Sequence, residues 1–336
     1  MDVGGLPPEE RLPRTAMPFG SAEDVYAAGP GRPMCHCATV ASLPGSGEER
    51  LFASWYAGTE ECHPDVAVFG AAWTAARGWS TPRVLADTPD RPEGNPVLGV
   101  SPGGVLWLIF ATLDGTRWPS CRLRRMRSLD GGESWSPPED LPGGQIGWLV
   151  RNKPVVHGGT WLLPAYDEIR WQGFVLRSSD DGQTWRPGGR MVAPQGCIQP
   201  TLLPADGGDL AALLRCDDDG GPLWRTRSSD GGATWSSAEA TSLHNPNSAA
   251  DAVGRADGAW ILACNDLPLP VGRHRLVLRV SRDGGTTWPG CGLLVQGPGE
   301  YSYPAVIPGA AGDLHVLYTH DRTRIRHLRI RPGWPE

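Results

Sequence analysis

One eight-residue pattern, S-x-D-x-G-x-x-W, occurs four times in this chain. Its aspartates, Asp130, Asp180, Asp230 and Asp283, lie 50, 50 and 53 residues apart. Serine and aspartate side chains bond to nearby backbone groups and fix a turn, while glycine adopts positive φ without a steric penalty and tryptophan covers the turn with a large apolar face. A fixed period near 50 residues indicates a repeat architecture. Because each aspartate occupies a repeated position, we expect these residues to hold turns and to have no role in chemistry.

Between the repeated turns the chain carries pairs of short apolar runs, each bounded by turn residues. This pattern predicts β-strands, and no long segment with a helical period competes with it. The first runs of six units span 36–40, 95–98, 153–156, 199–203, 251–253 and 303–307, and the second runs span 50–55, 105–110, 161–163, 209–214, 259–263 and 313–318. Four antiparallel strands repeated six times predict a six-bladed β-propeller. We therefore expect an all-β fold in which residues 1–336 form one domain.

The two ends of the chain depart from the repeat. The first unit has a degraded turn at residues 72–79, and the last unit finishes at residues 324–330 without a turn and without an outer strand. The segment around Asp24-Val25-Tyr26 is predicted to supply that strand and close the ring. Residues 1–20 are expected to form a loosely ordered extension.

Composition excludes several classes of function. The 336 residues carry a net charge of −6 and are 40% hydrophobic, which suits one large all-β domain and gives no electrostatic footprint for nucleic acid. No apolar run approaches membrane-spanning length, and the polar N-terminus lacks the apolar core of a secretion signal, so a cytoplasmic location is expected. The eight cysteines are scattered without metal-ligand spacing, and we expect neither a cofactor nor a metal.

The predicted topology also indicates where a ligand binds. In each unit the first strand starts, and the second strand ends, at the same mouth of the ring, while the repeated turns lie at the other face. Residues two apart on a strand share a face, so polar residues at these positions point to the central channel. There an unpaired charge would be costly. The candidates at this mouth are His36, His63, Asp65, Glu93, Asn95, Arg151, Lys153, Gln199, Arg215, Asp251, Tyr301, Tyr303 and Arg322.

The repeated turns on a six-unit period resemble the sialidase (neuraminidase) superfamily with its bacterial neuraminidase repeats. The chain looks closest to the bacterial "predicted neuraminidase" branch of that superfamily. The motifs that carry this resemblance are Glu61-Cys-His-Pro-Asp-Val66, Arg151-Asn-Lys-Pro154, Ile198-Gln-Pro-Thr-Leu202, Asn245-Pro-Asn-Ser248, Asp251-Ala-Val253 and Ser302-Tyr-Pro-Ala-Val306.

The resemblance implies roles for particular residues. Sialidases bind the substrate carboxylate with three arginines, use a Tyr–Glu nucleophile pair and have an aspartate as acid/base. Arg215 and Arg273 match two of the arginines, Tyr301-Ser302-Tyr303-Pro304 matches the tyrosine motif, and Asp65 matches the acid/base. The chain departs from the family pattern at two places: His36 stands where the first arginine is usual, and Gln199 where the glutamate is usual.

Three functions remain open from the sequence. An exo-acting glycosidase on a small acidic saccharide would hold the carboxylate with Arg215, Arg273 and Arg151, use Tyr301 or Tyr303 at the reacting carbon, and protonate the leaving oxygen from Asp65. A lyase or isomerase at a uronate-like group would remove the α-proton with Lys153, His36 or Tyr303 and protonate the leaving group from His63. A non-catalytic glycan-binding propeller would bind the sugar without turnover.

Overall fold

The computed structural model describes residues 19–45, 47–216, 221–267 and 272–334, and it is built almost entirely of antiparallel strands. The all-β prediction is confirmed. Two short 3-10 helices, Trp118–Ser120 and Asp206–Gly208, interrupt the strands. Within the described ranges no helix is both long enough and apolar enough to span a bilayer.

Four of the five sheets each hold one group of strands, and these groups follow the predicted repeat units. The first contains β2 (Met34–Ser42), β3 (Arg50–Gly58), β4 (Ala67–Thr74), β5 (Gly78–Trp79) and β6 (Arg83–Ala86). The second contains β7 (Glu93–Val100), β8 (Leu106–Leu113), β9 (Cys121–Ser128) and β10 (Glu139–Asp140). Another contains β20 (Asp251–Gly254), β21 (Trp260–Cys264), β22 (Arg275–Ser281) and β23 (Gly290–Gln296). The last contains β24 (Tyr301–Pro308), β25 (Leu314–His320), β26 (Arg324–Ile330) and β1 (Phe19–Ala27).

The fifth sheet is larger because it combines two groups of strands. One group is β11 (Trp148–Val150), β12 (Val155–His157), β13 (Thr160–Asp167), β14 (Gln172–Ser178) and β15 (Arg186–Pro187). The other is β16 (Cys197–Pro204), β17 (Leu210–Cys216), β18 (Pro222–Ser228) and β19 (Glu239–His244). A single parallel residue pair, Gln172 with Cys197, joins the two groups.

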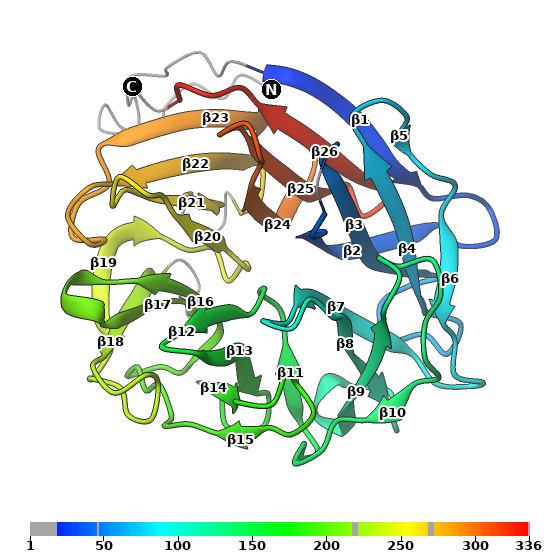
Figure 1. Ribbon diagram of the computed structural model, residues 1–336, viewed down its shortest axis with the longest axis horizontal. Helices are drawn as coiled ribbons and strands as arrows, with labels where there is room; N and C mark the ends of the chain where they lie inside the picture. Colours follow the sequence, from blue (N-terminus) through cyan, green and yellow to red (C-terminus); the bar gives the residue numbers. More distant parts are fainter. Residues whose placement is uncertain (1–18, 46, 217–220, 268–271, 335–336) are drawn as a thin grey trace.

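The sheets are arranged around a common centre, with the first strand of each group innermost (Figure 1). There β2 packs against β7 and β24, and β20 packs against β16 and β24. The hydrophobic clusters lie within the sheets and between neighbouring sheets, for example Val97, Trp107, Trp148 and Trp161. The core therefore forms a ring of apolar layers, and the polar residues of the inner strands are left at the centre.

The two ends of the chain meet in one sheet. Strand β1 pairs antiparallel with β26, the last strand, in a register that sets Asp24 opposite Arg326 and Tyr26 opposite Ile325. The prediction that this segment supplies the missing outer strand is confirmed. Phe19 and Gly20, the last two residues of the expected extension, begin β1, and Phe19 pairs with Ile330 of β26. The rest of that extension, residues 1–18, lies outside the described residues.

The repeated turns share one hydrogen-bonding scheme. In the second turn Ser178 Oγ accepts a bond from the Gly182 N–H (2.9 Å) and donates to Asp180 Oδ1 (2.8 Å), while Thr184 N–H donates to Asp180 Oδ1 (2.9 Å). The same serine–glycine bond measures 2.8, 2.8 and 2.9 Å in the other three turns. The side-chain oxygens of these aspartates therefore accept hydrogen bonds within their own turns.

These bonds have a measurable acid dependence. Hydrogen bonds from the Thr184 hydroxyl and amide hold the pKa of Asp180 at about 2, below the usual 3.8. A carboxyl whose folded-state pKa is lowered stabilises the fold above its unfolded-state pKa and loses that contribution as the pH falls through the folded-state value. We predict that Asp180→Ala lowers Tm at pH 7 and that its difference from wild type shrinks between about pH 4 and pH 2, as measured by thermal unfolding across that range. Glu133→Ala, at an exposed variable position of the first turn, is the control and should follow the wild-type curve; a constant deficit for Asp180→Ala at all pH values would contradict the assignment.

Candidate functional site

Four inner strands are interrupted by the same bulge. The pairing register shifts between residues 36 and 39, 94 and 97, 198 and 201, and 302 and 305. At each shift one residue has positive φ: Cys37 (61°), Asn95 (44°), Gln199 (53°) and Tyr303 (52°). A non-glycine residue in this region is strained and persists only where its surroundings fix it, and a bulge re-aims a side chain. The bulges thereby direct three polar side chains into one cavity.

That cavity has a volume of about 190 Å³. It lies at the predicted mouth, because its walls come from the starts of β7, β16 and β24, from the end of β17 and from the segments that follow β3, β13 and β25. Its lining residues are Tyr56, Glu61, Asn95, Trp118, Tyr166, Glu168, Trp171, Ile198, Gln199, Arg215, Arg273, Tyr303 and Arg322.

Arg215 connects the tyrosine to the glutamine. Its Nη1 donates to Tyr303 Oη (2.9 Å) and to Gln199 Oε1 (3.1 Å), and its Nε donates to Asn247 Oδ1 (2.6 Å). The guanidinium also lies over the Trp171 ring, 5.8 Å from its centroid. Arg215 is therefore fixed on several sides, with its charge directed at the phenol oxygen.

Two further arginines share one carboxylate. Arg273 Nη1 lies 3.0 Å from Glu300 Oε1, Arg322 Nε lies 3.1 Å from Glu300 Oε2, and Arg322 Nη1 lies 2.5 Å from Glu61 Oε2. Burial by itself would raise the pKa of Glu300, but the Ser302 hydroxyl and the two guanidinium groups outweigh it and hold that pKa below the usual value. Glu300 is thus ionised at neutral pH and positions both arginines.

The ring of Tyr303 has a cationic environment. The guanidinium carbons of Arg151 and Arg273 lie 5.1 and 5.4 Å from its centroid, and Arg151 Nη2 donates to Pro304 O (2.9 Å). His36 packs on the same ring at 4.2 Å between centroids. Burial, together with the nearby arginines, lowers the pKa of His36 well below its usual value, so this imidazole is neutral at pH 7. Arg151 and His36 therefore lie behind the tyrosine and support it.

Asn95 and Tyr166 form the opposite side of the cavity. Asn95 Nδ2 donates to Tyr166 Oη (3.0 Å), and Gln199 Nε2 lies 3.4 Å from the same oxygen. Burial raises the pKa of Tyr166 well above its usual value. This side of the cavity therefore offers neutral hydrogen-bonding groups.

Asp65 and His63 are placed together, but they do not line the cavity. His63 Nδ1 lies 2.6 Å from Asp65 Oδ1, and the Thr59 hydroxyl donates to Asp65 Oδ2 (2.7 Å). Partial burial would raise the pKa of Asp65, but the bonds from Thr59 and His63 outweigh it and lower the pKa. A general acid needs to hold its proton near the working pH, and in this arrangement Asp65 does not.

Lys153 and Asp251 form a buried ion pair outside the cavity lining, with Lys153 Nζ 2.7 and 2.8 Å from the two carboxylate oxygens. Burial lowers the pKa of Lys153, and the charge of Asp251 opposes that shift.

Glu93 is also outside the lining. It accepts bonds from the hydroxyls of Thr88 and Thr112, each at 2.5 Å, and burial raises its pKa.

Tyr301 likewise lies outside the lining, and its ring packs edge-on against His320 at 4.9 Å. Of the two tyrosines in the motif, the structure therefore puts Tyr303 in the cavity. Six predicted site residues line it: Asn95, Gln199, Arg215, Arg273, Tyr303 and Arg322.

Several residues that shape the site were not among the predicted site residues. Glu300 and Asn247 bind the arginines, and Trp118 and Trp171 form walls. A signal for Glu300 exists in the sequence, because it directly precedes an inner strand at the polar mouth. The tryptophans lie in loops whose course the sequence pattern does not fix.

The family model for the BNR repeat-like domain matches residues 49–316 of the chain. The chain belongs to this family. The predicted resemblance to sialidases is confirmed at the level of the fold by solved structures. No curated protein matches the chain significantly.

The solved structures are similar in fold and distant in sequence. The Hadza microbial sialidase Hz136 aligns with a TM-score of 0.77 at 18% identity, covering 92% of this chain and 68% of that one. A protein of unknown function from Dyadobacter fermentans aligns with a TM-score of 0.78 at 16% identity, covering 94% and 98%. The intramolecular trans-sialidase from Ruminococcus gnavus, solved with oseltamivir carboxylate, aligns with a TM-score of 0.76 at 14% identity, also covering 94% and 98%. At these identities the comparison shows a sialidase-like fold.

The shared carboxylate gives a prediction for stability. Glu300→Gln removes the charge between Arg273 and Arg322 and should destabilise the fold by about 1–3 kcal/mol at pH 7, as measured by urea unfolding. Glu60→Gln, an exposed glutamate near the same mouth, is the control and should change stability by less than about 0.5 kcal/mol. Equal stability of the two variants would show that Glu300 does not hold the arginines.

Proposed function

We propose that the cavity binds a terminal sugar that carries a carboxylate and that the protein hydrolyses its glycosidic bond. The observation that carries this proposal is the convergence of Arg215, Arg273 and Arg322 with Tyr303 in one cavity. Guanidinium groups match the geometry of a carboxylate in paired hydrogen bonds. The relatives in the same fold include sialidases.

The size of the cavity favours a single sugar residue. Its volume of about 190 Å³ is below the roughly 300–1,000 Å³ of pockets for drug-sized ligands. The indoles of Trp118 and Trp171 line it and offer apolar faces to a sugar ring. An exo-acting enzyme that takes one terminal unit therefore fits better than an enzyme that binds along a chain.

Tyr303 is proposed as the group that acts at the reacting carbon. A carboxylate nucleophile would be repelled by an anionic sugar, whereas a phenol approaches it as a neutral group. Arg215 donates to the phenol oxygen (2.9 Å), and Arg151 and Arg273 lie against the ring. This environment stabilises the negative charge that develops on Tyr303 as its oxygen bonds to the reacting carbon and its proton passes to solvent water.

The proton for the leaving oxygen is assigned to a carboxyl that lines the cavity. Glu61 and Glu168 are the two in the lining, and Glu61 is bound to Arg322 at 2.5 Å. We assign the proton transfer to one of these two carboxyls, with Asp65 as the alternative if the loop that carries it moves on binding.

Lyase chemistry at a uronate-like group is the second candidate. It is favoured by Gln199, which stands where the resemblance implies a glutamate. Tyr303, which lines the cavity with Arg215 and Arg273, would take the proton next to the carboxylate that these arginines hold.

For the architecture, we propose a single domain of six blades. The support is the separation of the nine-stranded sheet into two groups joined by one residue pair, the pairing of β1 with β26, and the contacts among innermost strands of neighbouring groups.

The two reactions give different products. The purified protein should release the fluorophore from a fluorogenic sialoside or another acidic glycoside, with no new absorbance in the ultraviolet band of an unsaturated uronate. Appearance of that band with uronate oligosaccharides would establish the lyase instead. Saturable binding of acidic sugars with neither product would leave only a binding function.

Arg215→Ala tests whether the cavity is the active site. Loss of the contact to Tyr303 and of one carboxylate donor should lower kcat/KM by about 100-fold or more in the assay that detects turnover. Arg282→Ala, on the repeated turn at the other face and with its side chain 56% exposed, is the matched control and should retain full activity. Full activity of Arg215→Ala would place the reaction elsewhere.

A further inference from the structure

A second polar cluster lies at the joint between the first and last sheets, apart from the arginine-rich cavity. It contains Glu49 before β3, Asp313 before β25, His315 on β25, His327 on β26 and Glu23 on β1. His315 and His327 have no exposed surface, and Asp313 is 2% exposed. The proposed hydrolysis uses none of these residues.

Three ligand groups of this cluster converge. His315 Nε2 lies 3.2 Å from Glu49 Oε2 and 3.7 Å from Asp313 Oδ2, and one ligand atom from each of the three residues lies within 4.8 Å of the others. With bonds of about 2.0–2.2 Å, ligand atoms around a tetrahedral zinc ion are about 3.3–3.6 Å apart. The two separations from His315 Nε2, 3.2 and 3.7 Å, lie within about 0.1 Å of that range.

One carboxylate oxygen in the cluster is buried without a partner. Asp313 Oδ2 is paired with Arg329, but Asp313 Oδ1 accepts no hydrogen bond from the described residues. A buried carboxylate oxygen without a partner costs free energy. A cation between Asp313, Glu49 and His315 would satisfy it.

The far side of His315 is arranged like the outer shell of a metal site. His315 Nδ1 lies 2.9 Å from His327 Nε2, and His327 Nδ1 lies 3.2 Å from Glu23 Oε1. If His327 donates to Glu23, then His315 donates to His327, and the lone pair of His315 Nε2 faces Glu49 and Asp313. Histidines that bind metals have this pattern, in which the other ring nitrogen donates to a fixed acceptor.

The alternative proton arrangement needs no metal. The Trp79 indole N–H donates to His327 Nδ1 (3.2 Å), so without an ion the protons are reversed and His315 Nε2 donates to Glu49. An ion bound at His315 Nε2 requires the first arrangement, in which Glu23 accepts the proton of His327 Nδ1. The charge balance favours binding of such an ion. Among the described groups that contact the two histidines or Asp313, three are carboxylates (Glu23, Glu49 and Asp313) and one is a cation, Arg329. With neutral histidines the net charge is −2, which a divalent ion would balance.

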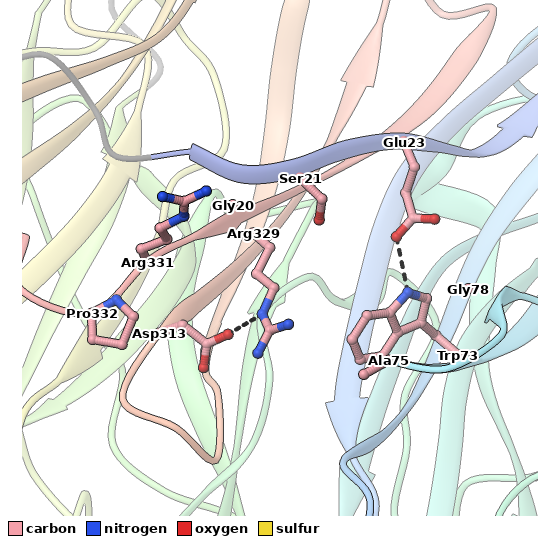
Figure 2. Close-up of a pocket in the computed structure, with 10 residues that line it drawn as sticks. All are labelled: Gly20, Ser21, Glu23, Trp73, Ala75, Gly78, Asp313, Arg329, Arg331 and Pro332. Carbon is pink, nitrogen blue, oxygen red and sulfur yellow. Dashed lines mark hydrogen bonds and ion pairs between the residues drawn. The ribbon is translucent and has the colours of Figure 1, made fainter.

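The cluster can be reached from outside. Asp313 and Arg329 line an open pocket of about 570 Å³, together with Glu23 and Trp73. Figure 2 shows Asp313 directed at Arg329 on one side of this pocket and Glu23 directed at Trp73 on the other. An ion therefore has a path to Asp313.

We propose that Glu49, Asp313 and His315 bind a divalent transition-metal ion, of the zinc or manganese kind, that ties the first sheet to the last. Two carboxylates and one imidazole suit these ions better than calcium, which takes oxygen ligands. Glu49 lies before β3 in the first sheet, whereas Asp313 lies before β25 and His315 lies on β25 in the last sheet. The ion therefore links the first sheet to the last.

Metal content and stability of the full chain test this proposal. The protein is stripped with a chelator, and Zn²⁺, Mn²⁺ and Ca²⁺ are then added separately. The stripped protein should take up roughly one equivalent of Zn²⁺ or Mn²⁺, with a rise in Tm that grows with ion concentration, and Ca²⁺ should have no such effect. Uptake of no ion and an unchanged Tm would overturn the proposal and establish the metal-free proton arrangement.

Variants locate the ion independently of enzyme activity. His315→Ala and Glu49→Gln should both lose the bound metal and the metal-dependent rise in Tm. Glu49→Gln keeps the side-chain shape, so it decides the question if His315→Ala does not fold. His244→Ala, an exposed histidine on β19, is the control and should bind as wild type does. Unchanged metal binding by Glu49→Gln would place the ion elsewhere and overturn the proposal.

Discussion

The buried carboxylate of Asp251 connects four inner segments at the centre of the ring. It accepts hydrogen bonds from Lys153 Nζ (2.7 Å), Thr201 Oγ1 (3.0 Å) and the Val306 amide (2.9 Å). These donors come from the segment before β12, from β16 and from β24. A buried ion pair is tolerated when further hydrogen bonds satisfy its remaining oxygens and protons, and Lys153 Nζ also donates to Ala252 O (2.7 Å). Neighbouring amides add to the same network, because Asn152 Nδ2 donates to Gln199 O and Ala250 O.

This central network makes the strained mouth possible. The left-handed residues Gln199 and Tyr303 lie at the start of β16 and β24, and the network holds these strands through Thr201 and Val306. The cavity then brings the guanidinium groups of Arg215, Arg273 and Arg322 together with one phenol, and these positive charges would repel one another without compensation. Glu300 and Glu61 supply that compensation from the segments beside the cavity. The charges are therefore fixed before any ligand arrives, and little reorganisation is needed when negative charge develops at the site.

The sequence predicted the fold better than it predicted the site. The turn pattern, the strand pairs and the closing strand around Asp24 could be read because each depends on local chemistry repeated at a fixed period. The rule that residues two apart on a strand share a face failed at the inner strands. It placed Glu93 on the same face as Asn95, and Tyr301 on the same face as Tyr303. Only the second member of each pair lines the cavity. The cause is the bulge, which inserts a residue and changes the direction of the side chain. Lys153 was predicted at the same mouth, but its partner Asp251 lies 98 residues away, and no local pattern reports such a contact.

Charge balance distinguishes the buried network at Asp251 from the buried cluster at His315. Asp251 has one buried cation, Lys153, and its oxygens accept bonds from backbone and hydroxyl donors, so both of its oxygens are satisfied without a ligand. Among the described residues, the cluster around His315 has more carboxylates than cations and keeps one oxygen of Asp313 without a donor. It also lies beside the sheet in which the two ends of the chain pair, β1 with β26. A joint of this kind benefits most from an added cross-link, because opening it exposes the edges of β1 and β26 while the other sheets stay intact. The incomplete coordination and the position at the joint thus point to the same role: the cluster at His315 stabilises closure, whereas the network at Asp251 fixes the centre on which the cavity is built.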